Sequence, residues 1–287
     1  MGIVNVTRDS FSDGGQFFDR DRAIAHAIEL LSDGADIVDV GGESTRPGKK
    51  DFVTADEEKQ RTLPVIEGIL RQVPRTVISI DTYKAETAKT ALDSGAEIVN
   101  DVSGFTWDGD MLPSLSASTG GCVLMHTRGR PEEWRNLPPL DPAEVVPLVF
   151  EDLRRLAERA VHAGVQRERI VLDPGFGFGK RLDENFSLLA GLAELHQLKF
   201  PLLSGTSRKS FLAKETTADR GADRLAGTIA TVTASILQGA HLVRVHDVKS
   251  TIEAVRAADS ILHARELAQS GRRGSNSQVI SPLVTSS

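Results

Sequence analysis

Carboxylates, amides and basic side chains stand directly after several short apolar runs of this chain. Such runs are typical of buried strands, and the ends of parallel strands meet at one edge of a sheet. Carboxylates gathered at a dry edge repel one another and lose hydration, so they need a donor-rich partner. A flat heterocycle with adjacent N–H donors suits carboxylate oxygens, although for any single residue capping of the next loop is an equal alternative. The residues at the run ends are Asn5, Asp39, Asp81, Asn100, Asp101, His126, Asp173, Ser204, Arg244 and His246.

Three glycine-rich loops and one basic loop follow four of these runs, and groups that suit a phosphate lie in and beside them. The planar guanidinium of Arg46 can bind a phosphate through two N–H groups. Arg244 and His246 alternate with Val245, so both face the same side of their strand. Together with Asn5 they could hold a diphosphate, with or without Mg²⁺ bridging its oxygens. Barrel loops of this kind are often lids that order on substrate, and plain connections are the alternative. The loops are residues 9–15, 41–48, 173–180 and 205–210.

The elements that must position these side chains follow a regular order. Eight apolar runs each precede a helical stretch with no hairpin dipeptide between them, which predicts an α/β fold with a parallel sheet. No G-x-G-x-x-G turn follows the first run, so we expect a closed (β/α)8 TIM barrel rather than an open doubly wound sheet. The predicted strands are residues 3–6, 37–40, 77–80, 98–99, 122–125, 170–172, 202–203 and 242–245. The predicted helices are residues 22–32, 54–71, 85–93, 142–162, 184–195, 223–237 and 252–267, with a short one near Leu112.

Length and composition limit the remaining possibilities. The 287 residues fit a single domain of this fold, placed at residues 1–271, while residues 272–287 lose periodicity and are predicted to be a disordered tail. No apolar run approaches the roughly 20 residues that span a bilayer, and no secretory signal opens the chain, so we expect no membrane contact. The net charge of −6 argues against nucleic acid as a partner. Cys122 is the only cysteine, which fits the reducing cytoplasm.

The motifs of this chain resemble those of the dihydropteroate synthase family over nearly its whole length. The matching segments are residues 1–7, 9–15, 41–48, 80–82, 100–104, 173–180, 207–210 and 244–246. The resemblance implies a barrel enzyme of folate biosynthesis that joins 7,8-dihydropterin-6-ylmethyl diphosphate to p-aminobenzoate and releases pyrophosphate. It also implies a sulfonamide target and a homodimer. We expect Mg²⁺ as cofactor, with Asn5 as its protein ligand.

By position, the resemblance assigns roles to individual residues. The pterin would be held by Asp81, Asn100, Asp173 and Lys209, with Arg244 stacked on its face and Met125 packed nearby. The diphosphate would be held by Asn5, Arg46, Arg244 and His246. The p-aminobenzoate pocket would contain Thr45, Pro47, Phe178, Lys209 and Ser210. The lid loop would contain Asp9, Ser10, Phe11, Ser12 and Asp13. The residues expected to act in catalysis are Asp81, Asp173, Lys209, Arg244 and His246.

This reaction needs charge stabilisation rather than a nucleophilic side chain. If the C–O bond breaks first, as in an SN1-like route, positive charge spreads into the pterin and negative charge grows on the leaving pyrophosphate. Asp81 and Asp173 would stabilise the first charge and the basic groups the second, each by roughly 3–4 kcal/mol where water is excluded. The attacking aromatic amine is neutral, so no strong base is required.

Two departures from the family pattern stand at the start of the chain. Arg8 replaces the usual proline, from which we expect a looser first loop and a raised substrate KM. The family normally has further residues ahead of Met1, often as a hairpin under the barrel, so we expect a trimmed start that affects stability more than chemistry.

Three alternatives remain open. A methyltetrahydrofolate–corrinoid methyltransferase has a similar pterin barrel, but it does not need the Ser-Thr-Arg-Pro and Ser-Arg-Lys-Ser loops. A catalytically weak or silent pterin-binding paralogue has Arg8 as its only support. An aldolase that uses Lys209 as a Schiff-base lysine is more remote, because Lys209 lies beside Arg208 on a loop rather than buried in a strand.

Overall fold

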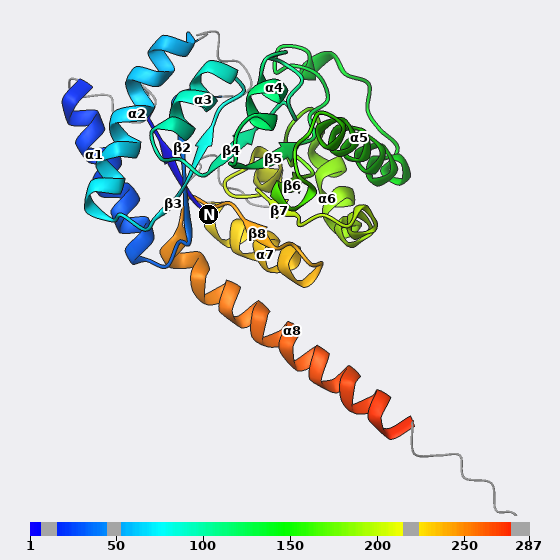
Figure 1. Cartoon of the computed structure of the whole chain (residues 1–287). Helices are drawn as coiled ribbons and strands as arrows, with labels where there is room; N and C mark the ends of the chain where they lie inside the picture. The colour runs from blue at the N-terminus through cyan, green and yellow to red at the C-terminus, as the bar shows by residue number, and fades with distance from the viewer. Residues whose placement is uncertain (7–15, 45–52, 215–223, 277–287) are drawn as a thin grey trace, which may run out of the picture.

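Strands and helices alternate along the chain in the computed structural model, which describes residues 1–6, 16–44, 53–214 and 224–276 (Figure 1). The strands are β1 Gly2–Asn5, β2 Ile37–Gly41, β3 Val77–Asp81, β4 Ile98–Asp101, β5 Gly121–Met125, β6 Ile170–Asp173, β7 Leu203–Ser204 and β8 Leu242–Val243. The helices are α1 Gln16–Ser32, α2 Ala55–Gln72, α3 Ala85–Asp93, α4 Met111–Ser116, α5 Pro142–His162, α6 Leu182–Ala190, α7 Leu225–Leu237 and α8 Val248–Asn276. Short 3₁₀ helices lie at Trp134–Asn136, Arg167–Arg169, Leu192–Leu198 and Ser210–Lys214.

The strands close into a ring. β1 to β6 form one parallel sheet in chain order, and β7 pairs with β8 in a second sheet. Two bridges join the sheets, because Gly2 pairs with Val245 and Leu172 pairs with Leu202. At the first bridge the Ile3 amide donates to the Val245 carbonyl at 3.0 Å. The predicted (β/α)8 barrel is therefore confirmed, and Figure 1 shows the helices arranged around the outside of the strands.

Local sequence signals account for several element ends. The Thr54 hydroxyl accepts a hydrogen bond from the Glu57 amide at 3.2 Å and caps α2, as the capping box predicts. Gly34, Gly95 and Gly239 follow α1, α3 and α7 with φ values of 107°, 103° and 95°. Glycine adopts this left-handed conformation without a Cβ clash. The same glycine turn therefore leads the chain from each of these three helices into the next strand.

Some boundaries differ from the prediction. The helix predicted at residues 184–195 divides into α6 and a 3₁₀ helix around Gly191, which packs so closely that a Cβ there would lie 2.6 Å from Cγ2 of Val146. The strand predicted at residues 242–245 ends as β8 at Val243, although the Arg244 amide still donates to the Ser204 carbonyl at 3.0 Å. Tertiary packing decides where α6 and β8 end, and the periodicity of the sequence carries no information on that packing.

The last helix is longer than predicted. α8 continues to Asn276, and thus into residues 272–276 of the predicted disordered tail. Arg272 and Arg273 are good helix formers and no proline interrupts this stretch, so the helix continues in spite of the poor helix formers Gly271 and Gly274. Residues 277–287 lie outside the described part of the chain, as do residues 7–15, 45–52 and 215–223.

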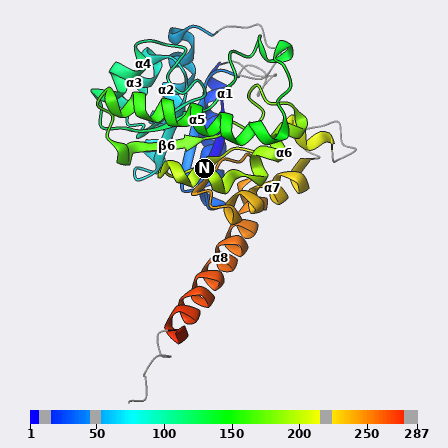
Figure 2. The same ribbon diagram turned by 90° about the vertical axis from the view of Figure 1, so that its right-hand side faces the viewer.

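α8 also separates from the rest of the molecule along its length. It spans about 43 Å at 1.5 Å per residue, and Figures 1 and 2 show it extending away from the barrel. Its first half packs beside α7, where Ala258 is fully buried. Further along, Ile261 and Leu267 are 49% and 60% exposed. Among the described helices, α8 included, none has the length and apolar character that a membrane span requires.

Candidate active site

The register of the first four strands places four residues at one level of the barrel mouth. Asn5 pairs with Gly41, Gly41 pairs with Asp81, and Asp81 pairs with Asn100. Gly41 lies next to Asp81, so that a Cβ on Gly41 would lie 3.4 Å from the Cβ of Asp81, in ordinary contact. The predicted residues Asn5, Asp81 and Asn100 therefore share the carboxyl-terminal edge of the strands, where active sites of such barrels lie.

Arg244 connects this row to β2 across the ring. Its Nε donates to Oδ2 of Asp39 at 2.6 Å, and its Nη2 donates to Oδ2 of Asp81 at 2.7 Å. Nδ2 of Asn100 donates to the same Asp39 oxygen at 2.9 Å. We call Asp39, Asp81, Asn100 and Arg244 the arginine centre. Asp39 is completely buried, and its Oδ1 has no partner among the described residues.

Burial and pairing set the charges of the arginine centre. Burial raises the pKa of Asp81 to about 7, and the nearby carboxylate of Asp39 adds to the effect while Arg244 opposes it. Burial alone would lower the pKa of Arg244, but Asp39 and Asp81 raise it overall. The guanidinium is therefore held permanently charged, whereas the Asp81 carboxyl can gain a proton near neutral pH.

Asp173 lies at the end of β6, on the other side of the mouth. It is 6% exposed, and its Oδ1 accepts a hydrogen bond from the Gly175 amide at 2.7 Å. Burial raises its pKa, while the Gly175 amide and the nearby Lys209 ammonium oppose the shift. Met125, which pairs with Asp173 in the sheet, is also buried. The predicted pair thus shares one level at the ends of β5 and β6.

An aromatic and cationic group lies beside Asp173. Nζ of Lys209 lies 4.0 Å from the centroid of the Phe178 ring, a cation–π distance. Trp134 packs edge-on against the same ring with centroids 5.3 Å apart. Ser210 follows Lys209 and is exposed at the start of a 3₁₀ helix. The predicted residues Phe178 and Lys209 are therefore in contact, and Ser210 adjoins them in sequence.

Ser207 orients the predicted residue His246. The Ser207 hydroxyl oxygen accepts a hydrogen bond from the His246 amide at 3.2 Å and lies 3.1 Å from Nδ1 of the same residue. With the amide as donor, the hydroxyl proton is available to Nδ1, and the Nε2 position of a neutral imidazole then carries the ring proton. A second pair holds the loop in place, because the Arg208 guanidinium forms an ion pair with Asp247. This arrangement suits an imidazole that donates from Nε2.

The base of the second glycine-rich loop is fixed by buried charges. The Lys84 ammonium pairs with Glu43 and lies 3.3 Å from Glu58. Nη1 of Arg61 donates to the Gly42 carbonyl at 2.8 Å. Only the first residues of this loop can be described. Its predicted members Thr45, Arg46 and Pro47, and the lid residues Asp9, Ser10, Phe11, Ser12 and Asp13, lie outside the described residues.

Two residues at strand ends do not face the site. Both carboxylate oxygens of Asp101 accept backbone amides of the following loop, those of Ser103 and Phe105. His126 turns outward, and its Nε2 lies 3.1 Å from Asp152 on α5. Both were among the run-end residues expected to gather at the mouth, so that expectation is wrong for them; Asp101 instead follows the alternative, capping of the next loop. Asp39 was expected at the mouth as a run-end residue, although no substrate role was assigned to it. Ser207 and the buried Lys180 lie in the predicted loops, but sequence reasoning gave neither of them a role.

A family model described as pterin binding enzyme matches residues 1–246 of the chain. This chain belongs to the pterin-binding enzyme family. The match covers every strand and each of the site residues described above.

Named relatives and solved structures show which members of this family the chain is similar to. The pterin-binding enzyme is 42% identical to dihydropteroate synthase of Escherichia coli over 93% of its own length and 92% of the relative. It is similar to Xanthomonas albilineans dihydropteroate synthase with 4-aminobenzoic acid, with a TM-score of 0.84, 39% identity and coverage of 91% and 92% of the two chains. It is also similar to Yersinia pestis dihydropteroate synthase in a sulfonamide drug complex, with a TM-score of 0.85, 38% identity and coverage of 92% and 94%.

Proposed function

We propose that this pterin-binding enzyme is a dihydropteroate synthase. It joins 7,8-dihydropterin-6-ylmethyl diphosphate to p-aminobenzoate, forming 7,8-dihydropteroate and pyrophosphate. The observation that carries the proposal is the arginine centre, which places two carboxylates, an amide and a guanidinium at the mouth of a pterin-family barrel. Such a set can accept the N–H donors of a pterin and also stabilise charge in its ring.

The pterin binds between the two sides of the mouth. Asp81 and Asn100 supply acceptors and donors from β3 and β4, and Asp173 supplies a carboxylate from β6. Arg244 keeps its contact with Asp39 and lies against the ring face, with Met125 nearby. Because the pKa of Asp81 is raised to about 7, this carboxyl gains acceptor strength as the pH rises above neutrality.

The bond between the pterin methylene carbon and the diphosphate oxygen breaks first. Its electron pair leaves with pyrophosphate, and the carbocation is stabilised by Asp81 and Asp173. The leaving group is held by Asn5, Arg46 and His246. Ser207 contacts Nδ1 of His246, which leaves the ring proton on Nε2 to be donated to the diphosphate. The amine nitrogen of p-aminobenzoate then forms the new C–N bond and gives up one proton.

The second substrate is held by the aromatic and cationic group beside Asp173. Phe178 offers a ring to stack on, Lys209 offers a charge, and Ser210 is exposed at the start of its 3₁₀ helix. Thr45 and Pro47 complete this pocket in the proposal, and sulfonamides compete for it. The lid residues 9–13 exclude water while the cation exists.

We propose that Asn5 would hold a Mg²⁺ ion together with the diphosphate of the substrate. Magnesium usually keeps several waters and takes only one or two protein oxygens together with substrate phosphates. The carboxamide oxygen of Asn5 fits that role at the barrel mouth, and the described residues contain no cluster of three metal-binding side chains that would hold a resident ion. The ion would balance the charge that develops on pyrophosphate.

The wider setting of the enzyme is also a proposal. We propose a homodimer, supported by two apolar residues of α8, Ile261 and Leu267, that are exposed. Figure 1 shows the end of this helix extending away from the barrel. Light scattering on the purified chain tests the homodimer, and a monomer at micromolar concentration contradicts it. We also propose a cytoplasmic location, because the single cysteine, Cys122, is a buried free thiol.

A pyrophosphate-release assay with and without p-aminobenzoate tests the function. We expect release that depends on p-aminobenzoate, together with 7,8-dihydropteroate detected by mass. Tight pterin diphosphate binding without release would instead identify a silent binder, and release without incorporation would identify a hydrolase. Asp93→Asn serves as a control, because Asp93 lies on α3 with an exposed side chain.

A further inference from the structure

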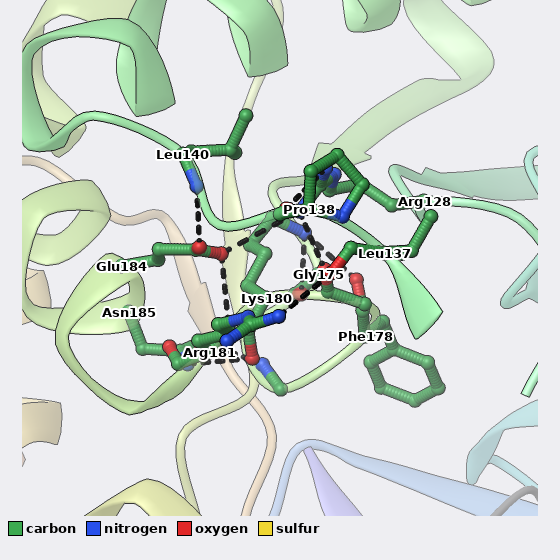
Figure 3. A network of polar contacts seen from close by, with 12 residues as sticks. Arg128, Leu137, Pro138, Leu140, Gly175, Phe178, Lys180, Arg181, Glu184 and Asn185 are labelled. Carbon is green, nitrogen blue, oxygen red and sulfur yellow. Dashed lines mark hydrogen bonds and ion pairs between the residues drawn. The ribbon is translucent and has the colours of Figure 1, made fainter. Parts of the chain in front are cut away.

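Lys180 ends the glycine-rich loop after β6 and is buried at 7% exposure, yet none of the roles above uses it. Its Nζ donates to the Gly175 carbonyl at 2.8 Å and the Phe178 carbonyl at 3.3 Å, and lies 3.5 Å from the His126 carbonyl. No carboxylate of the described residues is within ion-pair distance of it. Figure 3 shows the ammonium enclosed by the loop. Three backbone carbonyls thus take the place of a counter-ion, and we call these four residues the lysine centre.

The glycines of the loop direct these carbonyls toward Lys180. Gly175, Gly177 and Gly179 have φ values of 69°, 81° and 68°. A Cβ on Gly175 would lie 1.9 Å from the His126 carbonyl oxygen, so no other residue fits there. Alternating left-handed residues fold the loop back on itself. Its carbonyls converge on one point, and the ammonium occupies that point.

Other side chains hold the outside of the same loop. Oδ1 of Asn185 accepts the Gly177 amide at 2.7 Å, and its Nδ2 donates to the Lys180 carbonyl at 3.2 Å. Nη1 of Arg128 donates to the Gly179 carbonyl at 3.2 Å (Figure 3). These contacts secure the two flanks of the loop, and the Phe178 amide closes its turn by donating to the Gly175 carbonyl at 3.1 Å. Among the described side chains, only that of Lys180 donates to the carbonyls of both Gly175 and Phe178, and it is the only one that holds the Phe178 carbonyl.

The Phe178 carbonyl and ring belong to one residue, so the position of the first limits the second. The ring packs against Trp134 and under Nζ of Lys209. We propose that Lys180 is a positioning residue for the second substrate: its ammonium holds the Phe178 carbonyl, and thereby keeps the Phe178 ring beneath Lys209 in the pocket for p-aminobenzoate. This inference rests on the proposed function, because that function assigns the pocket to p-aminobenzoate.

Lys180 changes its charge near neutral pH. Burial lowers its pKa to about 7, and the nearby cations Lys209 and Arg128 lower it further, while Asp173 and Glu184 oppose the shift. His126 faces the loop only through its carbonyl. Charged donors form hydrogen bonds roughly twice as strong as neutral ones. The lysine centre is therefore tightest below about pH 7 and weakens as the pH rises through that value.

The first test is kinetic. Lys180→Met keeps an unbranched side chain one atom shorter than lysine and removes its charge, and we expect a KM for p-aminobenzoate about tenfold higher than wild type at pH 6.5. The KM for the pterin diphosphate should change by less than about twofold. Lys180→Arg keeps a charge that does not titrate, so it should restore most of the affinity and lack the rise in KM that wild type shows above pH 7. Lys89→Met, at an exposed site on α3, is the matched control.

The second test needs no catalysis. In a Trp107→Phe background the remaining Trp134 reports on the Phe178 ring, since the two rings are in contact. We expect Trp134 emission to change with a midpoint near pH 7, and the change to be absent in Lys180→Met. An unchanged KM for p-aminobenzoate in that variant, or Trp134 emission without a Lys180-dependent transition, would overturn the inference. If wild type makes no dihydropteroate, the proposed function fails, and the fluorescence result still decides whether Lys180 positions Phe178.

Discussion

Two cations lie at the mouth of one barrel, the partly buried Arg244 and the buried Lys180, and their pKa values are shifted in opposite directions. Arg244 donates to two carboxylates, and its pKa is raised. Lys180 donates only to backbone carbonyls, and its pKa falls to about 7. Both are largely withdrawn from water, so burial does not explain the difference. The partners do: full negative charges keep a buried cation permanently charged, whereas carbonyl dipoles leave it able to titrate.

The largest effect is expected at the arginine centre. Arg244→Met leaves Asp39 and Asp81 buried without their cation, which should lower the free energy of unfolding by about 3–5 kcal/mol. Denaturant unfolding measures it. The loss should be larger at pH 8 than at pH 6, because Asp81 takes up a proton as the pH falls through about 7 and then needs no counter-ion.

A surface arginine gives the matched control for that variant. Arg154 also pairs with two carboxylates, those of Glu151 and Glu158, but on the exposed face of α5. Arg154→Met should therefore lose far less stability than Arg244→Met. If both variants lost the same free energy of unfolding, the ion pairs of Arg244 at the mouth would stabilise the fold no more than an exposed pair does.

Asp173→Asn tests the lysine side of the mouth. The substitution keeps the shape of the side chain and removes the charge that the proposed cation needs, so kcat/KM for dihydropteroate formation should fall about 100-fold. Thermal unfolding should stay near wild type, because Asn can still accept the Gly175 amide. A variant with more than half of the wild-type activity would contradict the proposed role.

The two sides should respond to pH in opposite directions. Asp81 has a folded-state pKa raised to about 7, so its carboxylate is present above that pH and is lost below it. Affinity for a pterin ligand should therefore fall about tenfold from pH 8 to pH 6, as calorimetry can measure. Affinity for p-aminobenzoate should rise over the same interval as Lys180 gains its proton. Parallel pH profiles for both ligands would refute the separation of the two centres.

The smallest effect is expected from Ser207→Ala. His246 loses the partner of its Nδ1 and can present either nitrogen to the diphosphate. We expect the KM for the pterin diphosphate to rise about fivefold, with the KM for p-aminobenzoate unchanged. Initial rates under varied concentrations of each substrate separate the two values. A change confined to p-aminobenzoate would place His246 in the other half of the site.

Much of the site was predictable because it lies where strands end. Asp81, Asn100 and Asp173 close apolar runs, and parallel strands bring such ends together in any barrel. Lys180 was not predictable in its role. A lysine after a glycine string reads as a solvated loop residue, and only the folded loop shows its carbonyls converging on Nζ.

Sequence by itself determined the order of strands and helices, the glycine turns between them and the residue types at each strand end. Hydrophobic periodicity and backbone sterics act over a few residues, so a single chain suffices to read them. Tertiary structure decided which neighbours face the mouth. Asn100 contacts Asp39 inside the ring while Asp101 caps a loop outside it. That choice depends on the stagger of eight strands closed against one another, a relation between residues far apart in sequence.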